Sequence, residues 1–125
     1  MFRFADLVGR YRLVVSDELV EFVERAFVEP APPNDRERIR REAFDEAREA
    51  ELSIDLDGTI VSRAGTVEFC RVNVAFDDGE LEAFHFEKPP SSPVTLVLVD
   101  AERLVAYQPN KPPAEFRRTL GSSPP

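Results

Sequence analysis

The chain has 125 residues and a mass of 14.2 kDa, which predicts one domain that is long enough to bury a core without disulfides. Its net charge of −8, from 24 acidic and 16 basic residues, disfavours nucleic acid and anionic membrane surfaces. Such a charge is typical of an ordinary soluble protein and, as the alternative, favours a basic protein partner. No apolar run predicts membrane insertion, no secretory signal is visible, and one cysteine fits a reducing compartment. We therefore expect a cytoplasmic protein, with its oligomeric state left open.

The first fifty residues predict one strand followed by two helices. Residues 9–15 alternate in polarity, as in a strand, and Ser16 then suits the N-cap of a helix. Apolar residues recur after it at helical spacing, namely Leu19, Phe22, Val23, Ala26 and Phe27, before three prolines end the helix. A second helix, capped by Asn34 or Asp35, runs to about Ala50 and has a thin apolar edge, which is typical of a surface helix.

After Ala50 the hydrophobic period changes from about 3.6 to 2. Seven strands are predicted, over residues 51–57, 59–63, 66–76, 80–87, 94–100, 104–108 and 114–119. The connections between them are short, which predicts an antiparallel meander. We expect a single domain over residues 1–119, with a helical insertion at about 16–50, and a disordered tail over residues 120–125.

Two of these strands break the alternation of apolar residues. The apolar residues of 66–76 change phase at Cys70 and Arg71, which predicts a β-bulge at that point. Residues 80–87 carry apolar side chains on both faces. This pattern predicts either a second bulge or a strand that is covered on both sides.

Residues 54–65, IDLDGTIVSRAG, resemble the DxDGT nucleophile loop of the haloacid-dehalogenase-like phosphatases. The resemblance implies Asp55 as nucleophile, Asp57 as general acid/base and a magnesium ion. In that family the strand before the loop is central in a parallel sheet, and a crossover helix follows it. Here polar side chains alternate along the strand and no such helix follows, which is the pattern of a half-exposed antiparallel strand.

An Asp-Gly pair between alternating apolar residues instead predicts a two-residue type I′ hairpin. Both Asp57 and Gly58 would then take positive φ. The predicted cross-strand pairs are Leu56 with Thr59, Ile54 with Val61, and Leu52 with Arg63.

Two other segments resemble the calycin group, which contains lipocalins and fatty-acid-binding proteins. LVGRYRLVVSDELVEFVERA resembles the opening of fatty-acid-binding proteins, with Tyr11 at the usual tryptophan position. AEFRRT resembles the closing calycin strand, whose arginine packs over the first-strand aromatic, so the resemblance implies that Arg117 or Arg118 contacts Tyr11. The chain has no tryptophan, has fewer strands than a fatty-acid-binding protein, and lacks the R-x-Y that grips a fatty carboxylate there.

These patterns together predict a mainly β, α+β fold. We expect an antiparallel up-and-down lipocalin-like barrel of about eight strands, with a two-helix insertion after strand 1. The alternative is a cone-shaped α+β fold of the nuclear-transport-factor-like type, which usually begins with a helix. This chain is predicted to begin with a strand.

The candidate ligand-binding residues of such a barrel are Tyr11, His85, Tyr107 and Arg118. Arg118 would meet an acidic head group, or alternatively would act as a structural latch on Tyr11. His85 is either functional or structural, and Cys70 is either a reactive thiol beside Arg71 or a buried inert side chain. We predict no catalytic residue, metal site or cofactor, because no further motif supports one.

The leading expectation is a non-enzymatic lipocalin-like domain that binds a small apolar or amphipathic ligand. The alternative is an acidic protein-interaction module, of adaptor, inhibitor or immunity type, with a packed core and a basic partner. A third alternative is the phosphatase implied by Asp55 and Asp57. A barrel cavity of a few hundred cubic ångströms would favour the ligand-binding function.

Overall fold

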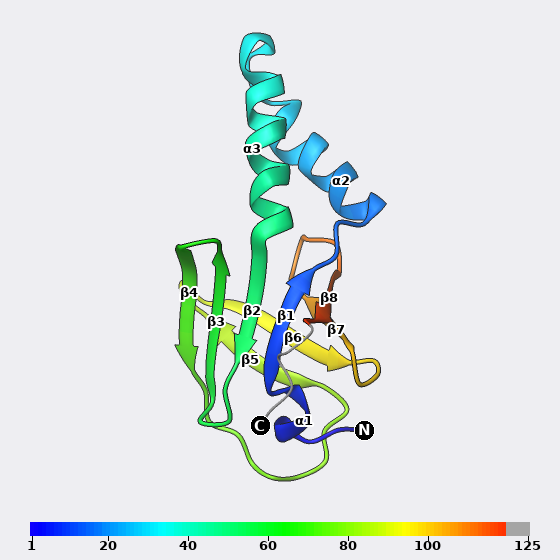
Figure 1. Cartoon of the computed structure of the whole chain (residues 1–125), viewed down its shortest axis with the longest axis vertical. Coiled ribbons are helices and arrows are strands. Elements are labelled where there is room, and N and C mark those ends of the chain that lie inside the picture. The colour runs from blue at the N-terminus through cyan, green and yellow to red at the C-terminus, as the bar shows by residue number, and fades with distance from the viewer. Residues whose placement is uncertain (120–125) are drawn as a thin grey trace.

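The computed structural model describes residues 1–119. Eight antiparallel strands form a nearly closed barrel, and helices follow the first strand, which confirms the predicted fold class (Figure 1). The helical hairpin stands above one end of the barrel and does not lie across it. The tail predicted for residues 120–125 lies outside the described residues.

The elements follow a simple order along the chain. It begins with a short helix, α1 (Phe4–Leu7), and the first strand, β1 (Gly9–Leu13). The helical hairpin contains α2 (Asp17–Val23), the π-helical turn η1 (Glu24–Val28), the 3₁₀ turn η2 (Pro33–Asp35) and α3 (Arg36–Glu49). The other strands are β2 (Ala50–Ile54), β3 (Thr59–Ala64), β4 (Val67–Asn73), β5 (Phe84–Lys88), β6 (Ser92–Leu98), β7 (Arg103–Tyr107) and β8 (Ala114–Arg118). None of the helices within residues 1–119 has the length and apolar character needed to cross a bilayer.

The sheet is continuous because the last strand pairs with the first. The strand order is β4-β3-β2-β1-β8-β7-β6-β5, so strands that are consecutive in the sequence pair with each other, except β4 and β5. Where β8 meets β1, Tyr11 lies opposite Arg118, and Leu13 lies opposite Phe116. Strands β4 and β5 are the two ends of this order, and no ladder joins them within the described part of the chain.

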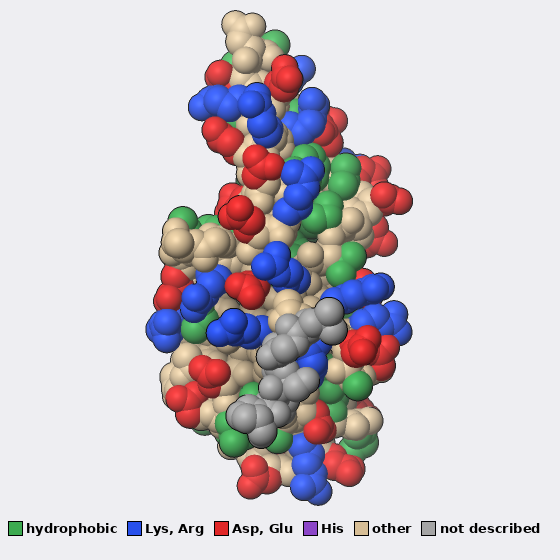
Figure 2. Space-filling view, in the orientation of Figure 1, with side chains coloured by type: hydrophobic (Ala, Val, Ile, Leu, Met, Phe, Trp, Pro, Cys, Tyr) green, Lys and Arg blue, Asp and Glu red, His purple; other side chains and the backbone are tan. Residues whose placement is uncertain are grey.

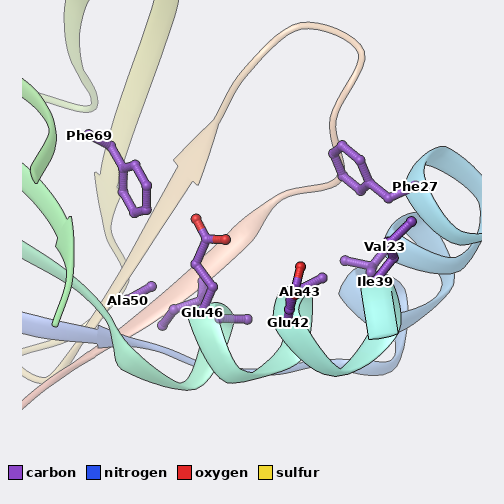
Figure 3. Close-up of a pocket in the computed structure, with 10 residues that line it drawn as sticks. Val23, Phe27, Ile39, Glu42, Ala43, Glu46, Ala50 and Phe69 are labelled. Atoms are coloured by element: carbon purple, nitrogen blue, oxygen red, sulfur yellow. The ribbon is translucent and has the colours of Figure 1, made fainter. Parts of the chain in front are cut away.

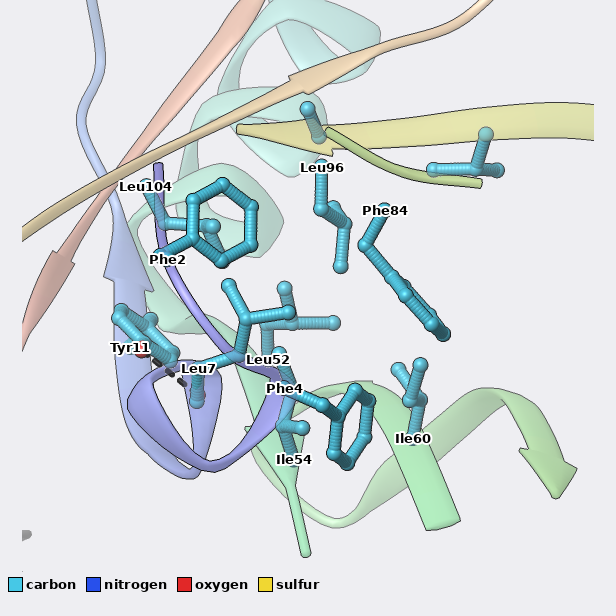
Figure 4. Close-up of a cluster of buried hydrophobic side chains, with 12 residues drawn as sticks. Phe2, Phe4, Leu7, Tyr11, Leu52, Ile54, Ile60, Phe84, Leu96 and Leu104 are labelled. Atoms are coloured by element: carbon cyan, nitrogen blue, oxygen red, sulfur yellow. Dashed lines mark hydrogen bonds between the residues drawn. The ribbon is translucent and has the colours of Figure 1, made fainter. Parts of the chain in front are cut away.

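The end of the barrel away from the hairpin is plugged by the N-terminal segment. Phe2, Phe4 and Leu7 are buried and point among the strand residues (Figure 4). The ring of Phe4 stacks on that of Phe76, with centroids 3.9 Å apart. Phe2 exchanges two backbone hydrogen bonds with Leu81, of 2.9 and 2.6 Å. Helix α1 was not predicted, because four residues are too few to show a helical period.

The two arms of the hairpin, α2 with η1 and then α3, begin and end close to where the two helices were predicted. The hydroxyl of Ser16 accepts a hydrogen bond of 3.2 Å from the Leu19 N–H, which is the predicted N-cap. Helix α3 lies inside the range predicted for the second helix. Arg40 of α3 donates to the carboxylate of Glu24 in η1, and this hydrogen bond lowers the pKa of Glu24. The contact joins the two arms of the hairpin near its turn.

Several predicted strands were too long. The strand predicted over 9–15 ends at Leu13, and the strand predicted over 66–76 is β4, which ends at Asn73. Of the residues 80–87, only those from Phe84 onward belong to β5. Leu81 instead forms an isolated bridge with Phe2, so its apolar side chain serves the N-terminal plug. Alternation alone could not show this, because apolar residues also pack on a core from loops.

The predicted bulge is present, but it lies at Phe69. Ser62 pairs with Cys70 and Arg63 pairs with Glu68, so Phe69 is the extra residue in β4. The change of phase in the sequence marked the region correctly, but the strand opposite decides which residue is left out. Phe69 is 49% exposed.

The hairpin between β2 and β3 differs by one residue from the predicted register. Ile54 pairs with Ile60, and Leu52 pairs with Ser62. The Asp55 N–H donates to the Thr59 carbonyl at 2.9 Å, so the loop has three residues, Leu56 to Gly58. This slip brings Ile54 and Ile60 together, and both are buried.

The loop has only one residue with positive φ, and that residue is Gly58, at 91°. The predicted type I′ turn requires two, so this part of the prediction was wrong. Asp57 has a different role, because its carboxylate accepts a hydrogen bond of 2.9 Å from the Thr59 N–H. That hydrogen bond lowers the pKa of Asp57. The DxDGT segment is therefore the tip of an antiparallel hairpin.

Replacing Gly58 by alanine should destabilise the fold. The new methyl group would meet the carbonyl oxygen of Val74, which is backbone and cannot move aside, and alanine disfavours the positive φ. We expect the free energy of unfolding in urea to fall by about 2 kcal/mol or more. The matched control is Gly79→Ala, whose methyl group meets only the movable carboxylate of Asp77. An equal loss in both variants would contradict this account of the loop.

Candidate functional site

Tyr11 and Arg118 meet inside the barrel wall, where β1 pairs with β8. Tyr11 is fully buried, and its hydroxyl donates to the Leu7 carbonyl at 2.7 Å and accepts from Nη2 of Arg118 at 2.8 Å. The guanidinium also lies over the tyrosine ring, 4.8 Å from its centroid. Burial raises the pKa of Tyr11, and the charge of Arg118 partly offsets this effect.

The guanidinium of Arg118 is engaged mainly with backbone carbonyls. It donates to Val8 at 2.6 Å, to Asp6 at 2.9 Å and to Ala101 at 3.0 Å, in addition to its bond with Tyr11. Four of the five N–H groups of an arginine are used in this way. The contacts tie β8 to the N-terminal segment and to the loop before β7, which is the arrangement of a structural latch.

His85 and Tyr107, the other two candidate ligand-binding residues, lie on the outer wall of the barrel. Phe84 is buried and His85 is exposed, because successive side chains of a strand point to opposite faces. Nδ1 of His85 lies 2.9 Å from Oγ1 of Thr95, also on the outer wall. Tyr107 follows the buried Ala106 and is 45% exposed. The four candidate residues therefore do not converge on one site. The prediction placed His85 on the same face of a strand as Leu81, but β5 begins only at Phe84, and within β5 it is Phe84 that points inward.

A cavity lined by described residues of the barrel interior has a volume of about 90 Å³. Its walls include Phe86 and Phe116, and the polar side chains among its lining residues are Ser62, Cys70, Lys88 and Gln108. Pockets for small molecules usually measure about 300–1,000 Å³. The interior of the barrel is therefore mostly filled by its own side chains, and Cys70 is half-buried in the wall of what remains.

A larger hollow lies outside the barrel, between its mouth and the helical hairpin. We call it the groove; its volume is about 420 Å³. It is lined by Leu13, Val23, Phe27, Ile39, Glu42, Ala43, Glu46, Ala47, Ala50 and Phe69. Phe27 and Phe69 lie at opposite ends of it, with the carboxylate of Glu46 between them (Figure 3). Figure 2 shows hydrophobic side chains exposed between the arms of the hairpin, among charged ones.

The aromatic side chains of the groove are unusually exposed. Phe27 is 54% exposed and Phe69 is 49% exposed, although both are large and apolar. The sequence placed Phe27 in the apolar stripe of the first helix, but it could not show that the hairpin stands away from the barrel. Phe69 lies in β4, at one end of the strand order, and its neighbour Val67 is also exposed. Sequence reasoning therefore missed both residues as members of a site.

One side of the groove is acidic. Glu42 and Glu46 of α3 line it, and Glu49 continues the same side toward an adjoining hollow that contains Val67. On the same helix, Asp45 forms an ion pair with Arg48 at 2.9 Å. No ion pair among the described residues involves Glu42, Glu46 or Glu49. The groove therefore combines apolar walls with carboxylates that form no ion pair within residues 1–119.

Comparisons with protein-family models, with curated proteins and with solved structures found no match. The geometry of the groove and the barrel therefore carries the functional argument.

Replacing Arg118 by lysine should lower the free energy of unfolding by about 2 kcal/mol or more, because a lysine cannot reach four separate acceptors. Chemical denaturation measures this loss. The matched control is Arg117→Lys, one residue away, where the side chain is exposed and lies 3.8 Å from Glu115. We expect that variant to unfold like the original chain. A latch role for Arg118 is contradicted if both substitutions have the same small effect.

Replacing Tyr11 by phenylalanine should lower stability by about 1–3 kcal/mol at neutral pH, because the Leu7 carbonyl loses its buried donor. It should also change the response to alkali. The raised pKa of Tyr11 means that its contribution is fully present below pH 10.0 and is lost as pH rises through the higher folded value. Urea unfolding from pH 9 to pH 11 should therefore show a shallower fall for Tyr11→Phe. An unchanged slope would argue against a buried neutral hydroxyl.

Proposed function

We propose that this chain is a non-enzymatic protein-interaction module that holds an apolar segment of a partner protein in the groove. The observation that carries the proposal is the contrast in volume between the two hollows. The barrel cavity is about 90 Å³, whereas the groove outside it is about 420 Å³. Another surface hollow, of about 430 Å³, is lined mainly by polar and charged residues, whereas the groove has mainly apolar walls, so binding in the groove would remove apolar surface from water.

The exposed phenylalanines support this proposal. Covering Phe27 and Phe69 would remove two large aromatic side chains from water, and aromatic residues in such positions are typical anchors of protein interfaces. The net charge of −8 and the acidic side of the groove favour a partner with basic residues. This is the adaptor, inhibitor or immunity type of function.

A small amphipathic ligand is the second candidate. It is favoured by the closeness of the two hollows, because Leu13, which lines the groove, lies opposite Phe116, which lines the barrel cavity. Lys88 also lines this cavity, and its ammonium group would suit an acidic head group. The apolar tail of such a ligand would occupy the groove.

We also propose a calycin-like relationship and a cytoplasmic location. The up-and-down order of strands, the helices after β1 and the contact of Arg118 with Tyr11 support the first. The single cysteine and the absence of disulfides from the described residues are compatible with the second.

Photo-crosslinking in the native cell tests the proposal. A benzophenone amino acid at position 27 or 69 should form covalent adducts of protein size, because these side chains would contact the partner. The matched positions are 85 and 107 on the outer wall, where we expect no adduct above background. Adducts of metabolite size at positions 27 and 69 would favour the small ligand instead. Equal crosslinking at all four positions, or none, would contradict binding in the groove.

A further inference from the structure

We propose that the segment held in the groove is a cationic amphipathic α-helix that lies along α3. Its apolar face would fill the groove, and its lysines or arginines would face Glu42, Glu46 and Glu49. This inference rests on the proposed function and specifies the chemistry of the partner. It follows from three features of the site, which are the spacing of the carboxylates, the shape of the apolar walls and the net charge.

The three glutamates form one stripe along α3. They occupy positions i, i+4 and i+7, so they lie on the same side of the helix and extend over about 10 Å of its length. No ion pair within residues 1–119 involves them, as described above. A second helix has the same rise per residue, so basic side chains at the same spacing would meet these carboxylates one to one.

The apolar walls have the form that a helix requires. Ile39, Ala43 and Ala47 of α3 line the groove together with Val23 and Phe27 of the other arm, and Val23 and Ile39 lie close together in Figure 3. Near the hairpin turn the two arms are held together by Arg40 and Glu24, whereas α2 diverges from α3 toward the barrel (Figure 1). A third helix placed between them would present an apolar stripe to both arms, as in other helix-in-groove complexes.

Other occupants fit less well. A second copy of this chain would bring a net charge of −8 and the same carboxylates against the groove, so the charges would repel. An extended strand would need the free edge of β4, but the bulge at Phe69 interrupts that ladder beside the groove. A helix needs no free strand edge, because its backbone hydrogen bonds lie within the helix. A cationic helix would also not be repelled by the carboxylates of the groove.

The test is fluorescence anisotropy of the full chain with a labelled peptide of leucine and lysine. The peptide has about 18 residues, which is long enough to form a helix, with leucines at i, i+3, i+4 and i+7. Binding should weaken about tenfold in the chain that carries Glu42→Gln, Glu46→Gln and Glu49→Gln. Phe27→Ser should weaken it about tenfold or more. Both effects together support the proposal.

A matched triple variant controls for net charge. Asp78→Asn, Glu80→Gln and Glu82→Gln remove the same number of charges from exposed positions away from the groove, and should change the affinity less than about twofold. An equal loss in this control would mean that the peptide senses only net charge, and would overturn the proposal. Failure of the lysine peptide to bind at all would also overturn it.

Altered peptides separate this inference from the proposed function. If glutamine replaces every lysine and binding still depends on Phe27 with equal affinity, the groove binds apolar segments but the cationic specificity is wrong. If two central prolines leave the affinity unchanged, the helical form is wrong. Sedimentation analysis of the chain alone should show a monomer, and a dimer that Phe27→Ser dissociates would identify a second copy as the occupant.

Discussion

The pairing of β8 with β1 is the constraint on which the rest of the structure depends. It joins the first and last strands, and Arg118 secures it by donating hydrogen bonds to Tyr11 and to three backbone carbonyls from two segments. Because these acceptors come from the N-terminal segment and from the loop before β7, one side chain of β8 connects three parts of the chain. The cation-π contact with Tyr11 adds to the hydrogen bonds within a part-buried environment.

The packing of the barrel also determines how much space its interior retains. With Phe2, Phe4 and Leu7 in one end and aromatic side chains along the wall, the cavity described above is smaller than an ordinary ligand pocket. At the other end, apolar side chains remain exposed in the groove under the hairpin, which stands away from the barrel. A filled barrel and an open groove are therefore two consequences of the same packing.

The sequence predicted much of the fold but little of the site. Alternation, turn residues and the Ser16 cap located the helices and most strands, because these signals depend on neighbours within a few residues. The register at Ile54 and Ile60, the bulge at Phe69 and the bridge from Phe2 to Leu81 depend on segments that meet only in the folded chain. The four candidate ligand-binding residues do not lie together for the same reason, since His85 lies on the outer wall.

The sequence by itself determined the class of fold, the place of the helical insertion and the contact between an arginine of the last strand and Tyr11. Local periodicity and turn chemistry are sufficient for the first two, and the calycin resemblance implied the third. Only the tertiary structure decided how much space the barrel retains and which apolar side chains remain exposed. Phe27 and Phe84 both belong to predicted apolar patterns of the sequence. Phe84 is buried in the core of the barrel, whereas Phe27 is exposed in the groove. The angle at which the hairpin leaves the barrel makes that difference, and no local pattern specifies this angle.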